Sequence, residues 1–152
     1  GLILMRAPFV FPFLGGRFGK GQGRERPAPS SRGASARQLA IALADDSRCT
    51  LLSFYSPNCK LCGRIGHQVE ELVEEQESHW LNLVRLNVED EIWTPEVSYY
   101  SISYVPCLLL LDRKNRARAK SGVPKSQKVV EESLHDMLVE GRKRFGRKRA
   151  SG

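Results

Sequence analysis

The residues best suited to chemistry are two cysteines, Cys59 and Cys62, which are separated by Lys60 and Leu61. A CxxC pair of this kind either exchanges electrons with disulfides or supplies half of a zinc site. The pair directly follows a short apolar run, residues 49–55, and opens a stretch with helical periodicity. This strand-to-helix setting favours the redox interpretation and predicts that Cys59 lies at the N-terminus of the helix.

Cys59 is predicted to be the nucleophile of the pair. Unpaired backbone N–H groups and the macrodipole at a helix N-terminus favour an anion, so we expect a pKa below the free-cysteine value of about 8.5. Lys60 adds a positive charge beside the thiol. Cys62 follows one turn later, where we expect it to be more buried and to resolve a mixed disulfide.

Helical and strand patterns alternate around the cysteine pair. Helices are predicted over residues 35–44, 59–78, 94–101 and 125–139, and strands over residues 49–55, 81–88, 105–111 and 117–121. This alternation predicts an α/β domain in which a mixed β-sheet carries helices on both faces. The acidic run 70–77 is expected to be the solvated face of the helix that follows the cysteines.

The formal net charge of +7 is concentrated at the two ends of the chain. Residues 1–38 contain seven lysines and arginines and one acid, whereas residues 141–152 contain six and no acid. Residues 1–34 are interrupted by glycine and proline, so we expect a disordered extension there that resembles a transit peptide or a linker. The folded domain is expected over residues 35–140, followed by a disordered basic tail over residues 141–152.

Length and composition exclude several classes of protein. A chain of 152 residues builds one core, which rules out a multidomain enzyme. Four cysteines are too few for a disulfide-dense secreted scaffold, and no apolar run approaches the ~18 to 20 residues that span a bilayer. The basic tail could attract nucleic acid, an anionic membrane or an acidic partner in a salt-sensitive way, or serve only as a solubilising end.

Three segments together resemble the thioredoxin fold family. They are Phe-Tyr-Ser-Pro-Asn-Cys-Lys-Leu-Cys at 54–62, Val-Arg-Leu-Asn-Val-Glu at 84–89 and Tyr-Val-Pro-Cys at 104–107. The resemblance extends over about residues 35–139 and implies a thioredoxin-like fold. It also implies a thiol–disulfide oxidoreductase that acts on protein thiols and disulfides, with no small-molecule substrate and no cofactor beyond its own redox-active disulfide.

Within the family, Leu86-Asn87-Val88 followed by Trp93 looks most like the thylakoid thioredoxin-like proteins of chloroplasts and cyanobacteria. The basic N-terminal segment agrees with that likeness. The resemblance therefore implies a chloroplast or other plastid location, either stromal or associated with the thylakoid.

The resemblance also implies roles for individual residues. Cys59 and Cys62 would be catalytic, and Lys60 and Arg85 would act electrostatically from beside the site. Val105, Pro106 and Cys107 look like the family's cis-proline loop, which faces the CxxC and binds the extended backbone of a substrate. A cis X-Pro bond normally marks a specific turn, so we expect one at Pro106.

The chain departs from the thioredoxin pattern at positions that bear on mechanism. Asn58 stands where the family has tryptophan, Lys60-Leu61 replaces Gly-Pro, and His67 replaces the proline that kinks the helix. Ser53 stands where the family buries a carboxylate that accepts a proton from the second cysteine, and a serine cannot do so near neutral pH. Arg85 replaces a lysine, which keeps the charge but cannot release a proton.

Two alternatives remain open at this point. Cys107 could simply fill the loop, form an alternative disulfide with the CxxC, or join Cys59 and Cys62 as a ligand of zinc or an iron–sulfur centre, with His67 as a candidate fourth ligand. The chain could also be a non-catalytic scaffold or assembly subunit of an organelle complex that reaches its partners through the basic ends. Cys49, Trp80 and Trp93 are expected to be packing residues.

Overall fold

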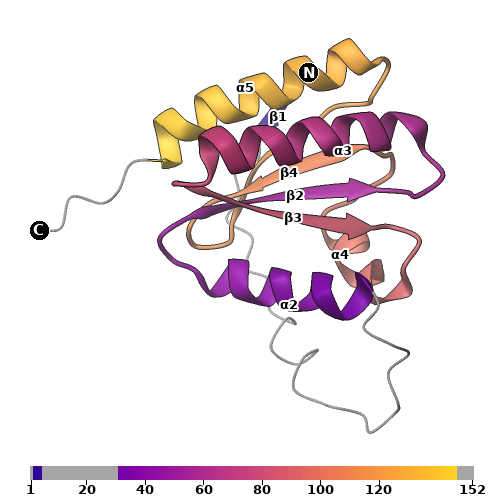
Figure 1. Ribbon diagram of the computed structural model, residues 1–152, viewed down its shortest axis with the longest axis horizontal. Coiled ribbons are helices and arrows are strands. Elements are labelled where there is room, and N and C mark those ends of the chain that lie inside the picture. The colour runs from indigo at the N-terminus through magenta and orange to yellow at the C-terminus, as the bar shows by residue number, and fades with distance from the viewer. Residues whose placement is uncertain (1, 5–30, 147–152) are drawn as a thin grey trace, which may run out of the picture.

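A five-stranded mixed β-sheet forms the centre of the protein in the computed structural model, which describes residues 2–4 and 31–146 (Figure 1). The strands are β1 (Leu2–Leu4), β2 (Cys49–Tyr55), β3 (Leu81–Asn87), β4 (Cys107–Leu111) and β5 (Ala117–Ser121). Their order across the sheet is β1-β5-β4-β2-β3. Strands β2 and β3 are parallel and the other neighbours are antiparallel, as predicted for a mixed sheet.

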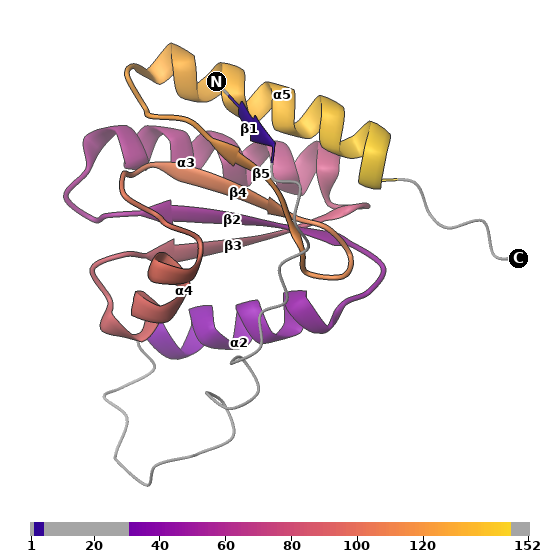
Figure 2. The same cartoon turned by 180° about the vertical axis from the view of Figure 1, so that it is seen from behind.

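Helices cover both faces of the sheet, which confirms the predicted layers. The helices are α2 (Ser31–Ala44), α3 (Lys60–Leu72), α4 (Thr94–Tyr99) and α5 (Gln127–Phe145), with a π-helical turn at Val73–Glu77 and a 3-10 turn at Glu91–Trp93. Helices α3 and α5 lie side by side on one face, and α2 and α4 cover the other (Figures 1 and 2). No helix in residues 31–146 is both long and apolar enough to cross a membrane.

The two faces of the sheet contribute to two separate apolar cores. Leu108 and Leu110 pack with residues of α3 and α5, whereas Leu109 and Leu111 pack with residues of α2. Successive side chains of a strand point to opposite faces, which explains the alternation. Because β4 is buried on both faces, it is apolar at every position instead of at every second one.

The N-terminal segment differs from the expectation at both of its ends. Residues 2–4 form a strand that pairs antiparallel with β5, with Ile3 opposite Lys120. The exposed edge of a sheet offers unpaired N–H and C=O groups, and a short apolar segment can take them up. Helix α2 begins at Ser31 instead of Ser35, although the added segment Ser-Arg-Gly-Ala contains a glycine, which is a poor helix former. The rest of the expected extension lies outside the described residues.

Helix α5 continues past the expected end at Val139 and into the expected tail, ending at Phe145. Arg142, Lys143 and Arg144 occupy its last turn, where positive charge is favoured by the helix dipole. Gly141 permits close packing there, since a Cβ atom at this position would lie 2.9 Å from Leu110 Cδ2 and 3.0 Å from the Trp80 ring. The remainder of the tail, residues 147–152, lies outside the described residues.

The expectation of a fully solvated acidic face is wrong at Glu77, whose side chain is buried. The π-helical turn contains one more residue than an α-helical turn, which rotates the following side chains about the helix axis and turns Glu77 inward. There its carboxylate accepts hydrogen bonds from the Trp80 indole and from Arg142 Nη2, the latter at 2.8 Å. Glu77 thus fastens the end of α5 beside β3. Trp80 and Trp93 are buried, as predicted for packing residues.

The Glu77–Arg142 pair yields a stability prediction. Arg142→Met keeps an apolar stem but leaves a buried carboxylate with one donor fewer, which costs about 1–3 kcal/mol. Since Arg142 is half exposed, solvent screening places the expected loss in the lower half of that range. The matched control is Lys143→Met, whose pair with Glu140 is exposed and should change stability by less than about 0.5 kcal/mol. Urea unfolding measures both, and equal effects would contradict the assignment.

Candidate active site

Cys59 caps the N-terminus of α3, as the sequence predicted. Strand β2 ends at Tyr55, and a turn closed by the bond from Cys59 N–H to the Ser56 carbonyl (3.1 Å) leads into the helix. Cys59 has extended backbone angles, and its Sγ accepts the backbone N–H of Cys62 at 3.1 Å. The sulfur therefore takes the place that a serine or aspartate oxygen takes in an ordinary N-cap.

Cys62 lies behind Cys59 and is 2% exposed, whereas Cys59 is only half-buried. Burial, with a further contribution from the hydrogen bond to Cys59, raises the pKa of Cys62 to about 12. At neutral pH the Cys62 thiol therefore keeps its proton while the more accessible sulfur is Cys59. All four cysteines of the chain are free thiols in the structure.

The predicted cis peptide bond is present between Val105 and Pro106. Pro106 is buried and Val105 is half-buried, and β4 begins at Cys107 instead of at Val105 because the ladder starts only after the proline. In the sheet, Cys107 is opposite Phe54 of β2. This pairing brings the cis-proline loop to the end of β2 from which the chain leads to Cys59.

The Cys107 side chain belongs to the core on the other face of the sheet from α3. It is fully buried together with Phe54, Leu109 and Trp93, and burial raises its pKa to about 11. The strand pleat explains the placement, since Leu108 is the residue of this pair that faces α3. The Cys107 side chain thus packs in this core at the start of β4.

The alternative metal site is not assembled. No three histidine, cysteine, aspartate or glutamate side chains in the described part of the chain form a group that could hold a metal ion. His67, the fourth ligand considered, lies on the exposed side of α3 with its Nε2 3.3 Å from Glu71 Oε1.

The Arg85 side chain extends from β3 toward α3 and lies close to Cys62. The guanidinium carbon lies 4.4 Å from the centre of the Tyr55 ring, and Nη1 lies 3.1 Å from Glu70 Oε1. A Cβ atom on Gly66 would come within 2.6 Å of Nη2, so the guanidinium rests against α3 one turn after Cys62. Its charge acts to lower the pKa of Cys62, although burial outweighs it.

The parallel register of β2 and β3 places Ser53 beside Arg85. Ser53 is buried and carries no charge, so the cation of Arg85 stands here without the carboxylate of the family pattern. Sequence reasoning identified Arg85 but missed Tyr55, Glu70 and Gly66, which position it. Only their spacing could have revealed them, since Tyr55 follows Ser53 on the same strand face and Gly66 follows Cys62 by one helical turn.

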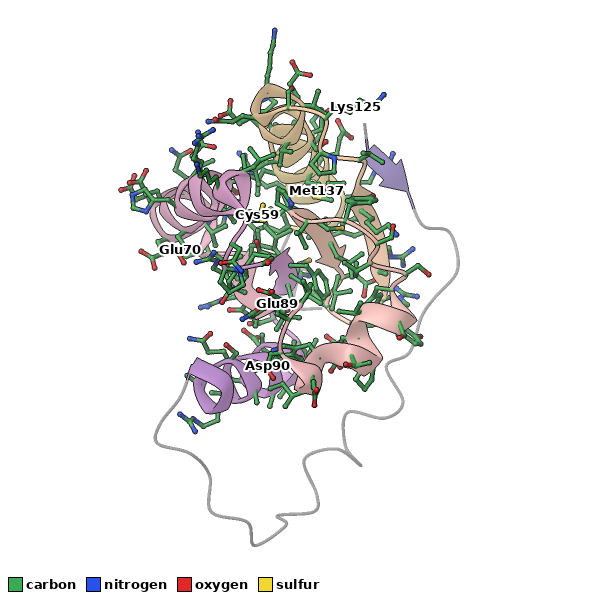
Figure 3. All side chains as sticks on the ribbon, turned by 90° about the vertical axis from the view of Figure 1, so that its right-hand side faces the viewer. Cys59, Glu70, Glu89, Asp90, Lys125 and Met137 are labelled. Atoms are coloured by element: carbon green, nitrogen blue, oxygen red, sulfur yellow. The ribbon has the colours of Figure 1, made fainter. Side chains whose placement is uncertain are left out.

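The turn before Cys59 has a second support that the sequence did not reveal. Ser56 Oγ donates to Glu89 Oε2 at 2.9 Å, and this bond joins the turn after β2 to the loop after β3. Figure 3 looks onto this end of the sheet and shows Cys59 near its centre, with Glu89 close by. Lys60, the first residue of α3, is exposed next to Cys59.

The arrangement matches known proteins over most of the described chain. Two cyanobacterial relatives are thiol:disulfide interchange proteins: the TxlA homolog of Synechocystis is 32% identical over 105 residues (67% of this chain, 58% of the relative), and TxlA of Synechococcus elongatus is 29% identical over 122 residues (78% and 62%). The thioredoxin-like protein HCF164, chloroplastic, of Arabidopsis thaliana is 30% identical over 81 residues (53% and 30%). The chain thus spans about three fifths of the length of its cyanobacterial relatives.

Solved structures agree on the fold. Thioredoxin F from spinach chloroplast superposes with a TM-score of 0.52 at 20% identity, covering 66% of this chain and 80% of its own. Trxlp from Edwardsiella tarda gives a TM-score of 0.52 at 18% identity, covering 72% and 95%. The family model described as thioredoxin matches residues 34–135, which include the CxxC and the cis-proline loop. The chain therefore belongs to the thioredoxin family.

Proposed function

We propose that the protein is a thiol–disulfide oxidoreductase that acts on protein disulfides. The observation that carries the proposal is the asymmetry of the CxxC: Cys59 is accessible and receives a backbone N–H, whereas Cys62 is buried behind it with a pKa of about 12. This asymmetry supports a reaction in which Cys59 meets the substrate first and Cys62 acts only after Cys59 has reacted.

The proposed reaction transfers two electrons in two exchange steps. The Cys59 thiolate attacks one sulfur of a substrate disulfide, whose S–S bond breaks; a Cys59–substrate disulfide forms and a substrate thiolate leaves. Cys62 then loses its proton and attacks Cys59 Sγ, which forms the Cys59–Cys62 disulfide and releases the second substrate thiolate. The two released thiolates take up two protons, which balance the protons lost by Cys59 and Cys62. A dithiol reductant restores the pair.

The second step requires the buried Cys62 to lose its proton without a carboxylate at position 53. We infer that Arg85 supports this step electrostatically, because a cation near the sulfur favours the thiolate. Arg85 cannot accept a proton, so the proton itself passes to solvent or to the leaving substrate sulfur. Lys60 is the corresponding positive charge on the outside, beside Cys59.

We further propose that Val105, Pro106 and the backbone of Cys107 hold the extended backbone of the substrate, since their loop lies at the same end of the sheet as Cys59. The partners are then protein thiols and disulfides. The chloroplastic and cyanobacterial relatives support a plastid location for this protein, with the thylakoid or the stroma as its compartment. Detection in isolated plastids by antibody tests the location.

Replacing each cysteine tests the roles assigned to the pair. Cys59→Ser should abolish reduction of insulin disulfides, and Cys62→Ser should trap a mixed disulfide that is visible on a non-reducing gel. The matched control is Cys49→Ser, because Cys49 is fully buried at the other end of β2 and should leave the reaction unchanged. Full activity of the Cys59→Ser protein would exclude the proposed chemistry, and a parent protein that reduces no insulin disulfides would favour the scaffold role.

Two glycines of α3 allow a test of Arg85. Gly66→Ala places a methyl group where the guanidinium lies, so the flexible Arg85 head should move away from Cys62. The resolving step should then slow by up to about tenfold, equivalent to one pKa unit of lost thiolate stabilisation. Gly63→Ala is the control, since its Cβ would meet nothing within 4 Å.

The measurement is the decay rate of a preformed mixed disulfide across a pH series. The Gly66→Ala profile should shift to higher pH, while the Gly63→Ala profile should keep the position of the parent protein. Identical profiles for the parent and Gly66→Ala would remove Arg85 from the mechanism.

A further inference from the structure

A hollow of about 1130 Å³ lies at the end of the sheet opposite to Cys59. Most of its lining residues come from the segment before β2, from the turn between β4 and β5, and from the end of α5, and His79 before β3 and Arg118 of β5 complete the walls. Strand β2 runs from Cys49 to Tyr55 and so points away from the hollow and toward the CxxC. Figure 1 shows these three segments gathered at the end of the sheet from which the β2 and β3 arrows start.

Positive charge dominates the lining of this hollow. The cationic side chains are Arg48, Arg113, Lys114, Arg116, Arg118 and Arg144, against two aspartates, Asp46 and Asp112. Five of the six cations are arginines, whose planar guanidinium matches two oxygens of one phosphate or carboxylate group at once. Residues 39–140 contain 11 lysines and arginines against 16 acids, so this concentration of positive charge is local.

Asp112 fixes the positions of two of these cations, Arg116 and Arg118, through hydrogen bonds. Its side chain is 6% exposed, and Oδ2 accepts from Arg116 Nε at 2.9 Å and from Arg118 Nε at 2.8 Å. Oδ1 accepts the backbone N–H groups of Lys114 and Arg116 at 2.9 and 3.0 Å. Burial raises the pKa of Asp112, but these hydrogen bonds together outweigh it and hold the pKa below its usual value. Asp112 therefore stays ionised at neutral pH.

The charges around Asp112 do not balance. One carboxylate holds two guanidinium groups side by side, which leaves a positive charge uncompensated within the triad. Arg116 and Arg118 are only 31% and 25% exposed, and the Arg118 guanidinium also lies 5.6 Å from the centre of the Phe145 ring. Each bond to Asp112 uses one of the five N–H donors of a guanidinium. The two cations are thus held in place in advance, which lowers the entropic cost of binding an anion.

We propose that this hollow binds a compact anion with two or more linked phosphoryl groups, such as the pyrophosphate moiety of a nucleotide. One phosphomonoester carries about −1.5 to −2 charges at pH 7, so linked phosphoryl groups match the charge excess of the lining. The concave shape and the recessed Asp112 triad fit a compact group better than a flat bilayer or a long strand. The site is separate from the CxxC and does not depend on its chemistry.

Calorimetric titration with inorganic pyrophosphate and with ATP, in low-salt buffer free of phosphate, tests the proposal. The unsubstituted protein, residues 1–152, should bind both pyrophosphate and ATP. Arg118→Gln should raise the Kd by about tenfold or more, because it removes one half of the organised pair. The control Arg64→Gln makes the same charge change on exposed α3, outside the hollow, and should leave the Kd unchanged.

A second variant covers the case in which Arg118→Gln unfolds the protein. Lys114→Gln with Arg144→Gln removes two exposed cations of the rim but leaves the side chains of Asp112, Arg116 and Arg118 in place, and should also weaken binding of pyrophosphate. Failure of pyrophosphate and ATP to bind, or equal weakening by Arg64→Gln, would overturn the proposal. Binding only to vesicles containing phosphatidylglycerol, or only to an oligonucleotide, would also overturn it in favour of an extended polyanion.

Discussion

Strand β2 is the constraint on which the rest of the structure depends. It pairs with parallel β3 along one edge and with antiparallel β4 along the other, and it is almost wholly buried on both faces. The pairing with β4 brings the cis-proline loop to the end of the strand, and the pairing with β3 sets Arg85 beside Ser53. The turn after Tyr55 then delivers Cys59 to the start of α3. A shift of one residue in either ladder would turn every side chain of the moved strand to the opposite face, so the site tolerates only this register.

The difference between Cys59 and Cys62 follows from this placement at the start of α3. Cys59 meets the free backbone N–H groups of a helix start, whereas Cys62, three residues later, is enclosed by the layer between α3 and the sheet. The two thiols are chemically alike in sequence and differ only in their surroundings. The same layer holds Arg85 against Tyr55, Glu70 and Gly66. A fixed cation thus stands where thioredoxins combine a lysine with a buried carboxylate, so the protein can favour a thiolate there but has no side chain at position 53 to take its proton.

The parts of the structure that depend on local patterns could be predicted from the sequence. The CxxC at a strand-to-helix junction and the strand Cys49–Tyr55 have short-range signatures, whereas the cis bond at Pro106 is expected from the resemblance of residues 104–107 to the thioredoxin loop. The parts that depend on tertiary pairing could not. The strand at Leu2–Leu4 requires a free edge on β5, and the inward turn of Glu77 requires a π-helical turn that no residue type announces. The face on which Cys107 lies depends on where β4 begins, and the surroundings of Arg85 depend on the β2–β3 register.

The two ends of the sheet thus carry different chemistry, with sulfur at one end and organised positive charge at the other. The central claim concerns the first, and equilibration of the protein across a series of dithiol–disulfide buffers tests it most directly. The remaining thiols are alkylated and the pairing is mapped by mass spectrometry. The account predicts one reversible disulfide, between Cys59 and Cys62, while Cys49 and Cys107 stay reduced in their cores. A Cys59 that never pairs with Cys62, or that pairs with Cys107 instead, would contradict it.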